Sequence, residues 1–415
     1  MPAPEACLLL IGSELTEGRL TDKNGPFLAA QLSQMGFQLG EIRILPDDSA
    51  KLRSAMQEAL HSRAELILSS GGLGHTRDDL TATLWAEILE DKLTVSESLL
   101  NHLQATLRER GISKLPYIER YALAPTRGKF FLNPVGLAPA LYWDLHTKVI
   151  CALPGPPAEL QSIWHVHLKP YLQNRFSLKP PLEHTIKTTG ITESRLSELI
   201  ASWEANLPVS IHLAYNPSWE GVSLHLRASP EIDRELFFNQ IEKLRALLKP
   251  YIYTEGAGSL AECIIKKLRE RGLTLAVAES CTGGHITASV VNVAGASDVL
   301  KGGVVAYANS TKIDLLGVVP EVLQTEGAVS ESTALQMAEG VRKALHAHVG
   351  VATTGIAGPT GGSAEKPVGT VWIGIATPIE TYAKRFVFSG GREVVIQRAT
   401  ATALSLLWQA LGKNS

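Results

Sequence analysis

Short apolar runs and amphipathic segments alternate over roughly the first 170 residues, and this alternation constrains the fold more than any other feature of the sequence. The apolar runs Ala6–Ile11 and Glu65–Ser69 predict strands, and Ser49–His61 predicts a helix. The pattern continues with a helix over Pro26–Met35 and strands over Leu39–Leu45, Leu141–Leu145 and Lys148–Leu153. Buried strands separated by helices predict a parallel sheet covered on both faces. Because ligands of such sheets bind beyond the carboxyl ends of the strands, the loops that follow strands are where chemistry is expected.

The length of 415 residues predicts two or three domains, and three regions can be distinguished. Residues 1–172 carry the alternation described above. A proline-containing linker over Arg175–Pro181 then leads to a small α+β unit, residues 182–254. The third unit, residues 256–415, begins at a helix cap on Ser259 and again alternates helices with strands. The sequence therefore predicts an α/β protein with a small α+β middle domain.

Composition narrows the classes of function. The formal net charge of -2 supplies no general attraction for nucleic acid or anionic lipid, so neither partner is expected and any phosphate must be held locally. The four cysteines form no CxxC pair and are expected to be reduced thiols. The apolar run near the N-terminus is too short for a signal sequence or a membrane span. We therefore expect a cytoplasmic protein.

A glycine-rich loop after the strand Glu65–Ser69 is the first candidate site. Its permissive and polar residues are Gly71, Gly72, Gly74, Thr76, Asp78 and Asp79. Glycines allow close backbone approach, and Thr76, Asp78 and Asp79 are expected to open a helix whose N-terminus can hold an anion. Two adjacent carboxylates suit a magnesium-like cation that bridges a phosphate. The same pattern also fits a plain strand-to-helix turn with Asp78 or Asp79 as its N-cap.

Two more loops follow predicted strands and are expected to converge on the same edge of the sheet. The loop within Ile11–Asn24 supplies Gly12, Glu14 and Asn24, and the loop within Leu153–Leu160 supplies Gly155 and Glu159. Asn133 precedes the latter in an irregular segment. Taken alone, Glu159 is also consistent with an acidic residue in the first turn of a helix.

The motifs IGSELTEG, GGLGHTRDDLT and LPGPPAEL together resemble the N-terminal domain of the CinA family, which is related to the molybdopterin-binding fold. The resemblance covers about 150 residues and implies a three-layer αβα domain. Similar domains are metal-dependent ADP-ribose pyrophosphatases, so the resemblance implies cleavage of ADP-ribose to AMP and ribose 5-phosphate. The loop residues named above would bind the substrate, and Asp78 and Asp79 would hold a divalent ion of the Mg or Co type, with K⁺ as a further candidate. The sequence departs from the family pattern at His75 and Lys23.

The motif ESCTGG, residues 279–284, follows the predicted strand Leu273–Ala278. Ser280 is expected at a helix N-terminus, with Thr282 in the first turn. An oxygen placed there lies beside unpaired N–H donors that can stabilise an oxyanion, which makes Ser280 a candidate nucleophile. The same pattern also fits an ordinary N-cap. Cys281 is a rival nucleophile without an evident histidine partner.

A serine hydroxyl needs a base, and the segment VVAYANSTK offers Tyr307 and Lys312. A buried lysine or tyrosine can accept a proton where no histidine is available. The alternatives are that Tyr307 is a strand aromatic residue and that Lys312 is a solvated helix residue.

The motifs ESCTGG, AGAS, GAVSE, TTGIAGPTGG, KPVGTV and FSGGRE, together with Tyr307 and Lys312, resemble the CinA C-terminal domain, which also occurs as the stand-alone nicotinamide mononucleotide deamidase PncC. The resemblance covers about 155 residues. It implies conversion of nicotinamide mononucleotide to nicotinic acid mononucleotide and ammonia without a cofactor. Ser280 would attack the carboxamide, Lys312 and Tyr307 would manage its proton, and N–H groups of the glycine-rich turn would hold the oxyanion. The implied substrate contacts are Cys281, Thr282, Gly283, Gly284, Ser297, Thr354, Gly355 and Arg392.

The sequence thus leads to a cytoplasmic, homodimeric enzyme of pyridine nucleotide recycling with two hydrolytic sites. The alternative is a non-catalytic molybdopterin- or nucleotide-binding module that acts in competence or the DNA-damage response.

Overall fold

A computed structural model describes residues 3–74, 76, 78–112 and 115–412. The chain divides into two compact units, Met1–Pro181 and Leu182–Ser415, which are described in turn. Within the described residues, every helix is too short or too polar to cross a lipid bilayer. The division into three domains stays a prediction, although the second unit contains two separate sheets.

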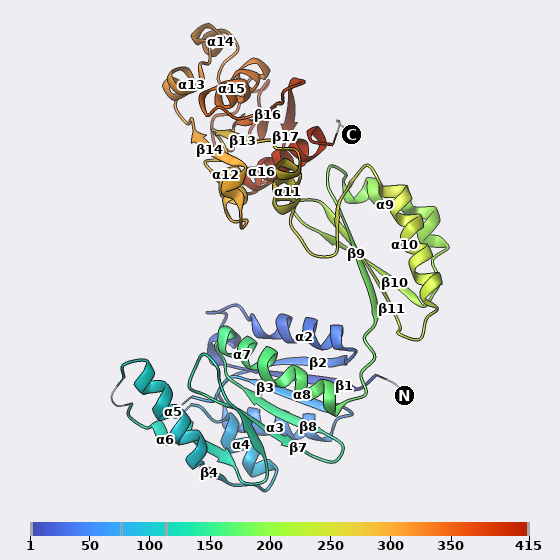
Figure 1. The fold of residues 1–415 in the computed structure, drawn as a ribbon, viewed down its shortest axis with the longest axis vertical. Helices are drawn as coiled ribbons and strands as arrows, with labels where there is room; N and C mark the ends of the chain where they lie inside the picture. The colour runs from blue at the N-terminus through green and yellow to red at the C-terminus, as the bar shows by residue number, and fades with distance from the viewer. Residues whose placement is uncertain (1–2, 75, 77, 113–114, 413–415) are drawn as a thin grey trace. The chain divides into compact units, whose positions relative to one another are not determined.

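The first unit is built on a six-stranded sheet in the order β2-β1-β3-β8-β7-β6 (Figure 1). Its strands are β1 (Glu5–Ile11), β2 (Gln38–Leu45), β3 (Leu66–Ser70), β6 (Lys129–Phe131), β7 (Ala140–Asp144) and β8 (Val149–Leu153). Strands β1, β2, β3 and β8 are parallel, but β7 and β6 are antiparallel to their neighbours. The expectation of a wholly parallel sheet is therefore wrong. The connection from β7 to β8 is too short for a crossover, so these two strands form a hairpin.

Helices cover both faces of this sheet, as Figure 1 shows. Leucines of α2 and the segment α7-η1-α8 pack on one face, and α3 and α4 pack on the other. The helical segments are α1 (Ser13–Thr16), α2 (Asn24–Met35), α3 (Ser49–His61), α4 (Thr81–Ile88), α5 (Glu97–Glu109), α6 (Ile118–Tyr121), α7 (Pro157–Ile163), the π-helical turn η1 (Trp164–Leu168) and α8 (Lys169–Arg175). A separate two-stranded sheet joins β4 (Leu93–Val95) to β5 (Leu123–Pro125). The predicted three-layer αβα domain is confirmed.

The middle part of the chain forms a four-stranded antiparallel sheet in the order β10-β11-β9-β12. Helices α9 and α10 supply Leu196, Ile200, Ile241 and Leu244 to its core. The bounds are β9 (Leu182–Thr188), α9 (Glu193–Ala205), β10 (Ile211–Pro217), β11 (Val222–Ala228), α10 (Arg234–Leu248) and β12 (Ile252–Glu255). The predicted small α+β architecture is confirmed.

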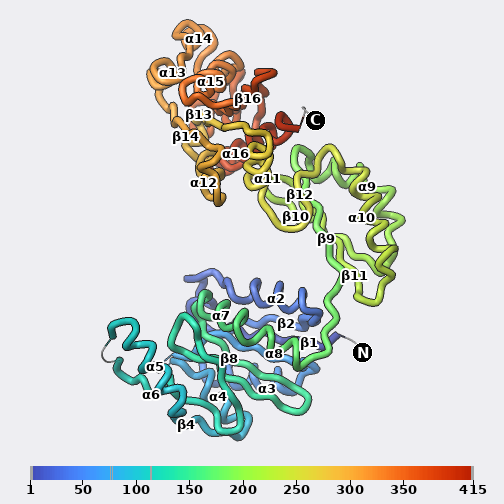
Figure 2. The backbone as a smooth tube through the Cα atoms, in the orientation of Figure 1, coloured from blue at the N-terminus to red at the C-terminus, as the bar shows by residue number. Residues whose placement is uncertain are grey.

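The C-terminal part contains a five-stranded sheet in the order β14-β13-β15-β16-β17, whose backbone path is followed in Figure 2. Strands β14, β13 and β15 are parallel to one another. Strand β16 is antiparallel to β15, and β17 is antiparallel to β16. Helices α11, α12 and α16 pack on one face, and α13 and α15 pack on the other. The strands are β13 (Leu275–Glu279), β14 (Leu300–Val305), β15 (Val349–Gly355), β16 (Thr370–Ala376) and β17 (Thr381–Val387). The helices are α11 (Leu260–Glu270), α12 (His285–Val291), the 3-10 turn η2 (Ala296–Asp298), α13 (Asn309–Leu316), α14 (Pro320–Thr325), α15 (Glu331–Ala344) and α16 (Arg392–Ala410).

Two expected helix starts are wrong. Helix α4 begins at Thr81, so Thr76, Asp78 and Asp79 belong to the preceding loop and not to a first turn. Helix α12 begins at His285, so neither Ser280 nor Thr282 lies in its first turn and Ser280 is not its N-cap. In both places a longer loop separates the strand from the helix. His75 lies outside the described residues.

Candidate functional site

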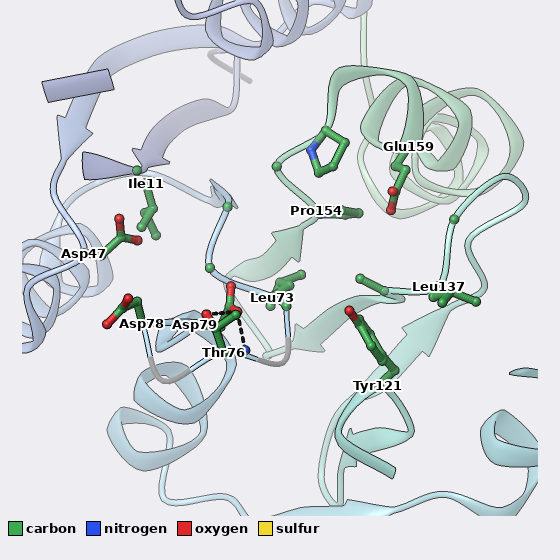
Figure 3. A pocket seen from close by; sticks show the side chains of 18 of the residues that line it. Ile11, Asp47, Leu73, Thr76, Asp78, Asp79, Tyr121, Leu137, Pro154 and Glu159 are labelled. Atoms are coloured by element: carbon green, nitrogen blue, oxygen red, sulfur yellow. Dashed lines mark hydrogen bonds between the residues drawn. The ribbon is translucent and has the colours of Figure 1, made fainter. Parts of the chain in front are cut away.

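A cavity of about 570 Å³ lies beyond the carboxyl ends of β1, β3 and β8 in the first unit (Figure 3). Three loops that follow these strands line it, and the segment after Asn133 closes one side. The predicted residues that line it are Gly12, Glu14, Gly71, Gly72, Gly74, Thr76, Asp78, Asp79, Gly155 and Glu159. Residues far apart in the sequence thus meet at one sheet edge, as parallel strands require.

Close contacts explain the glycine at two positions of this cavity, with backbone at Gly71 and with side chains at Gly136. Gly71 has a φ of +105°, and a Cβ there would collide with the carbonyl oxygen of Ile11. A Cβ on Gly136 would collide with the carboxylate of Glu159. A larger residue at Gly71 would push its loop away from the loop after β1, so this glycine sets the spacing of the two loops, whereas a larger residue at position 136 would displace the Glu159 carboxylate.

The carboxylate of Asp79 is turned back onto its own loop. Its Oδ2 accepts hydrogen bonds from Thr76 N at 2.8 Å and from Thr76 Oγ1 at 2.6 Å, as the dashed lines in Figure 3 show. No group of three or more metal-ligating side chains occurs among the residues that the structure describes. Magnesium commonly takes only one or two protein carboxylates and completes its shell with water and phosphate oxygens. Asp78 and Asp79 therefore fit a hard cation that is shared with a phosphate, but not a cage made by protein alone.

Asn133 does not line the cavity but holds its wall in place. Its Nδ2 donates to Glu159 Oε2 at 2.6 Å and to the carbonyl oxygen of Ala138 at 2.9 Å. Its Oδ1 accepts from the backbone N–H groups of Val135 and Gly136. Because both ends of its amide are hydrogen-bonded within the protein, the Asn133 side chain positions Glu159. The geometry favours this role over direct binding of substrate by Asn133.

Asn24 lines a second, adjoining cavity. Its Nδ2 donates to Ser70 Oγ at 2.9 Å and to the carbonyl oxygen of Gly155 at 2.7 Å. The side chain is only 8% exposed, and its Oδ1 is buried without a hydrogen-bond partner.

Sequence reasoning missed three residues that line the main cavity, namely Asp47, Arg110 and Tyr121. Asp47 accepts a hydrogen bond from Ser13 N, and Arg110 donates to the carbonyl oxygen of Val135. Burial raises the pKa of Tyr121, and the charges of Asp79 and Glu159 raise it further. Asp47 lies two residues after the predicted strand Leu39–Leu45, and this position was a signal that was not used. Arg110 and Tyr121 lie at the ends of α5 and α6, where no local signal marked them.

The candidate nucleophile and base of the C-terminal part lie together. Lys312 Nζ is 3.3 Å from Ser280 Oγ and donates to the carbonyl oxygens of Ala306 at 2.8 Å and Tyr307 at 3.2 Å. Ser280 is 8% exposed and Lys312 only 1% exposed, so Lys312 is not a solvated helix residue. Burial lowers the pKa of the Lys312 ammonium, and the smaller electrostatic effect of the nearby Cys281 raises it.

Burial favours loss of the extra proton of Lys312, because it lowers the pKa of the ammonium. A neutral amine has two N–H donors and one lone pair. As an ammonium, Nζ donates to both carbonyl oxygens and to Ser280 Oγ. Once the ammonium has lost a proton, the two carbonyl oxygens can accept both remaining N–H groups, and the lone pair can face the hydroxyl of Ser280. Lys312 is thereby placed to accept the proton of Ser280.

The neighbouring thiol is not prepared for nucleophilic attack. Cys281 is buried, and burial raises its pKa to about 12. Thiols react as thiolates, so Cys281 remains protonated and unreactive near neutral pH. The geometry therefore favours Ser280 over Cys281 as the nucleophile.

A buried carboxylate organises the turn after Ser280. Glu279 is fully buried, and its Oε2 accepts from the N–H groups of Gly284 and Ile286. Its Oε1 accepts from the N–H and the hydroxyl of Thr287. Glu279, at the end of β13, thus accepts hydrogen bonds from the backbone N–H groups at the start of α12. Ser280 is therefore not needed as the N-cap of this helix. The position of Glu279 directly before Ser280 was visible in the sequence, but the sequence analysis assigned no role to this glutamate.

Replacement of Glu279 by glutamine is expected to destabilise the C-terminal part by about 3 kcal/mol, because an amide nitrogen would face buried N–H donors that then lose their acceptor. Thermal and urea unfolding of the full chain measure this effect. The matched control is Glu262→Gln, because Glu262 accepts only one backbone N–H, at the exposed start of α11. Equal losses in the two variants would contradict the role given to Glu279.

The expected oxyanion donors require a correction. The N–H groups of Gly283 and Gly284 already donate to the carbonyl oxygen of Ser280 and to Glu279. Within the described part of the chain, the N–H group of Thr282 has no acceptor, and the N–H group of Cys281 contacts the sulfur of its own side chain. These two donors, which follow Ser280 directly, are the better candidates for an oxyanion hole.

The remaining predicted residues differ in their hydrogen bonds and in their exposure. Arg392 donates to the carbonyl oxygen of Gly358 at 2.9 Å and to Tyr307 Oη at 3.2 Å, although Tyr307 is 64% exposed. Gly355 ends β15, and Thr354 before it donates to the carbonyl oxygen of Ala328. The Thr282 hydroxyl is hydrogen-bonded to Thr353 Oγ1. Ser297 lies exposed in η2 and, among the described residues, has no hydrogen bond to Ser280 or Lys312.

Comparison with known proteins matches both ends of the chain. Residues 257–411 match the family described as "CinA C-terminal domain", and residues 7–174 match "Probable molybdopterin binding domain". A CinA-like protein of Amoebophilus asiaticus is 34% identical over 97% of this chain and 98% of its own length. The chain belongs to the CinA family. Another CinA-like protein, from Cytophaga hutchinsonii, is 35% identical over 98% of this chain and 98% of its own length.

Among solved structures, this CinA family member is similar to the competence/damage inducible protein CihA of Agrobacterium tumefaciens. The identity is 44%, the match covers 37% of this chain and 94% of the other, and the TM-score is 0.36. The names of these relatives establish the family and leave the reaction open.

Proposed function

We propose that the C-terminal part of this CinA family protein is an amidohydrolase that converts nicotinamide mononucleotide to nicotinic acid mononucleotide and ammonia. The observation that carries the proposal is the buried Lys312 Nζ held 3.3 Å from Ser280 Oγ by two carbonyl oxygens. A serine beside a neutral buried amine is a nucleophile and base pair suited to acyl transfer.

The reaction proceeds in two halves. Ser280 Oγ attacks the carboxamide carbon while its proton passes to Lys312, and the N–H groups of Cys281 and Thr282 bind the oxyanion. Lys312 then returns the proton to the amide nitrogen, the C–N bond breaks, and ammonia leaves an ester on Ser280. Water attacks this ester with Lys312 as base, which releases the carboxylate product and restores the Ser280 hydroxyl.

Arg392 is the residue best suited to the substrate phosphate. A guanidinium has five N–H donors, and the contacts to Gly358 and Tyr307 use only two of its groups. Because these contacts orient the guanidinium, Arg392 is preorganised for bidentate phosphate binding.

Ammonia release from nicotinamide mononucleotide by the purified full chain tests this proposal. Stoichiometric nicotinic acid mononucleotide is expected, and no added metal should be required. Binding of the nucleotide without ammonia release would instead favour the alternative of a non-catalytic binding module.

A second proposal concerns the first unit, which we infer to cleave ADP-ribose into AMP and ribose 5-phosphate. It is supported by the cavity in which glycine loops, Asp78 and Asp79 meet at one sheet edge. A divalent ion held by Asp78 and Asp79, when bound, would neutralise the diphosphate. Glu159, whose carboxylate accepts a hydrogen bond from Asn133, would accept the proton of the attacking water. The water oxygen bonds to one phosphorus as the bridging P–O bond breaks.

Asp79→Asn is expected to lower ADP-ribose cleavage by at least about a hundredfold, because it removes negative charge at the cation site. A chelator should have the same effect on the unmodified protein, and both treatments should leave ammonia release from nicotinamide mononucleotide unchanged. Measurement of both reactions on one preparation provides the control. Loss of both activities together would contradict two independent sites.

A further inference from the structure

Thr353 lies beside the candidate nucleophile, although it was not among the predicted site residues. It belongs to β15, which pairs in parallel with β13, and its partner in the register is Glu279, the residue directly before Ser280. Strand β14, which precedes the helix that carries Lys312, pairs with the other side of β13. The base and Thr353 therefore come from the two strands that flank β13.

The backbone and the side chain of Thr353 hold two different residues. Its carbonyl oxygen accepts a hydrogen bond from Ser280 N at 3.0 Å. Its hydroxyl is hydrogen-bonded to the hydroxyl of Thr282, with 2.7 Å between the two Oγ1 atoms. Both threonines are fully buried, so water does not compete for this contact. One residue of β15 thus fixes both the residue that carries the nucleophile and the residue two positions later.

The polar groups of Thr282 are held so that only its N–H group is left. The carbonyl oxygen of Thr282 accepts from His285 N at 3.1 Å and lies 2.6 Å from His285 Nδ1. Because a carbonyl oxygen can only accept, Nδ1 is the donor in this second contact. The hydroxyl of Thr282 is paired with Thr353, whereas its N–H group has no acceptor among the described residues. Thr282 is therefore fixed with a free donor close to Ser280.

The neighbouring Thr354 does not share this contact. Successive side chains of a strand point to opposite faces of the sheet. The hydroxyl of Thr354 accordingly donates to the carbonyl oxygen of Ala328 at 2.6 Å, and that of Thr353 meets Thr282. Of the two adjacent threonines, only Thr353 reaches the turn after Ser280.

We propose that Thr353 is a positioning residue of the amidohydrolase site, which holds the oxyanion donor Thr282 N in register with the nucleophile Ser280. This inference rests on the proposed function of the C-terminal part and adds a residue that acts through its neighbours. The oxyanion forms only as Ser280 Oγ attacks, so a correctly held donor stabilises the transition state and contributes little to substrate binding. Loss of the Thr353 hydroxyl therefore lowers kcat and leaves KM nearly unchanged.

Thr353→Val and Thr353→Ser test this role in the full chain. Valine keeps the shape and the backbone carbonyl but removes the hydroxyl, so kcat for ammonia release from nicotinamide mononucleotide should fall about tenfold to hundredfold, with KM within about threefold. Serine keeps the hydroxyl and should restore kcat to within about threefold. The matched control is Thr400→Val on α16, because the buried hydroxyl of Thr400 has no hydrogen-bond partner in the described part of the chain. Both constants should be unchanged in this control.

Thermal unfolding shows whether each variant is folded at the assay temperature, since a smaller folded fraction would also lower the apparent kcat. If Thr353→Val is not folded, Thr282→Val breaks the same hydrogen bond from the other side and should give the same loss of kcat. Where both fold, the double variant should lose no more than either single variant, because the two hydroxyls act through one bond. Losses that multiply in the double variant would overturn the inference.

A second measurement separates this inference from the proposed reaction. In the reaction with 4-nitrophenyl acetate, Ser280 Oγ forms an ester with the acetyl group, 4-nitrophenolate leaves, and the transition state carries the same kind of oxyanion. The acetylation rate of Ser280, located by mass spectrometry, should fall in Thr353→Val and recover in Thr353→Ser. If this pattern appears but the unmodified protein releases no ammonia from nicotinamide mononucleotide, the positioning role holds and the proposed amidohydrolase function is wrong.

The opposite outcome is equally distinct. If the unmodified protein releases ammonia and Thr353→Val does so with an unchanged kcat, the proposed function stands and the positioning role is overturned. An unmodified protein that neither releases ammonia nor is acetylated at Ser280 would contradict both.

Discussion

Ser280→Ala is expected to lower the rate of ammonia release from nicotinamide mononucleotide by at least about a thousandfold. Without the hydroxyl no ester intermediate forms, and the buried amine of Lys312 has no nucleophile to activate. Folding should be preserved, because the hydroxyl contacts only Lys312 Nζ among the hydrogen bonds of the structure's described residues. Single-turnover measurement of ammonia, together with thermal unfolding, separates the two effects.

Ser289→Ala serves as the matched control, since this serine lies on α12 and its hydroxyl donates only to the carbonyl oxygen of His285. Its activity should match that of the unmodified protein. A Ser280→Ala variant that still releases ammonia at an undiminished rate would rule out the nucleophile assignment. Loss of activity in Cys281→Ala alone would point to the thiol instead.

Lys312→Met and Lys312→Arg are both expected to lower kcat by about a hundredfold to ten-thousandfold, because neither side chain can accept a proton near neutral pH. The pair separates two roles for the residue. Arginine keeps the positive charge, so an active Lys312→Arg variant would show that charge matters and proton transfer does not. Methionine keeps the packing of the buried aliphatic chain, which leaves stability as a separate readout.

The pH dependence follows from the lowered pKa of Lys312. The active form is the neutral amine, which exists above this pKa, so kcat should fall as pH decreases through it. Because burial lowers the pKa of Lys312, this fall in kcat should occur at a lower pH than the pKa of an ordinary lysine would give. The pH profile of kcat for the unmodified protein measures the limb, and an activity that is constant or rises toward low pH would contradict the base assignment.

Local signals allowed some elements to be predicted from sequence. Helix α3 has the predicted bounds Ser49–His61, because Asp48 caps it and an apolar stripe continues to its end. The Ser259 cap of α11 was likewise visible, and it forms a capping box with Glu262. The direction of β7 was predictable too, although this signal was missed, because only His146 and Thr147 separate the predicted strands Leu141–Leu145 and Lys148–Leu153, too few residues for a parallel crossover.

The start of each helix after a glycine loop was misplaced for a physical reason. Polar residues in such loops resemble caps, yet Asp79 bonds back to Thr76 and the cap of α12 comes from Glu279 in the preceding strand. These contacts depend on how the loop folds over the end of the sheet. The meeting of Ser280 with Lys312 depends on the packing of β14 and α13. Residue chemistry could offer Lys312 and Tyr307 only as alternative bases, and family resemblance joined them to Ser280 in one site.

The burial of the Cys281 thiol beside Ser280 determines which covalent reagents can modify this site. Maleimides and iodoacetamide attack sulfur in its ionised form, which Cys281 does not reach under ordinary conditions. Electrophiles directed at oxygen, such as fluorophosphonates, meet a hydroxyl with a built-in proton acceptor instead. Covalent probes that test the proposed nucleophile should therefore be drawn from serine-hydrolase chemistry, and mild oxidants should leave the Ser280–Lys312 pair intact.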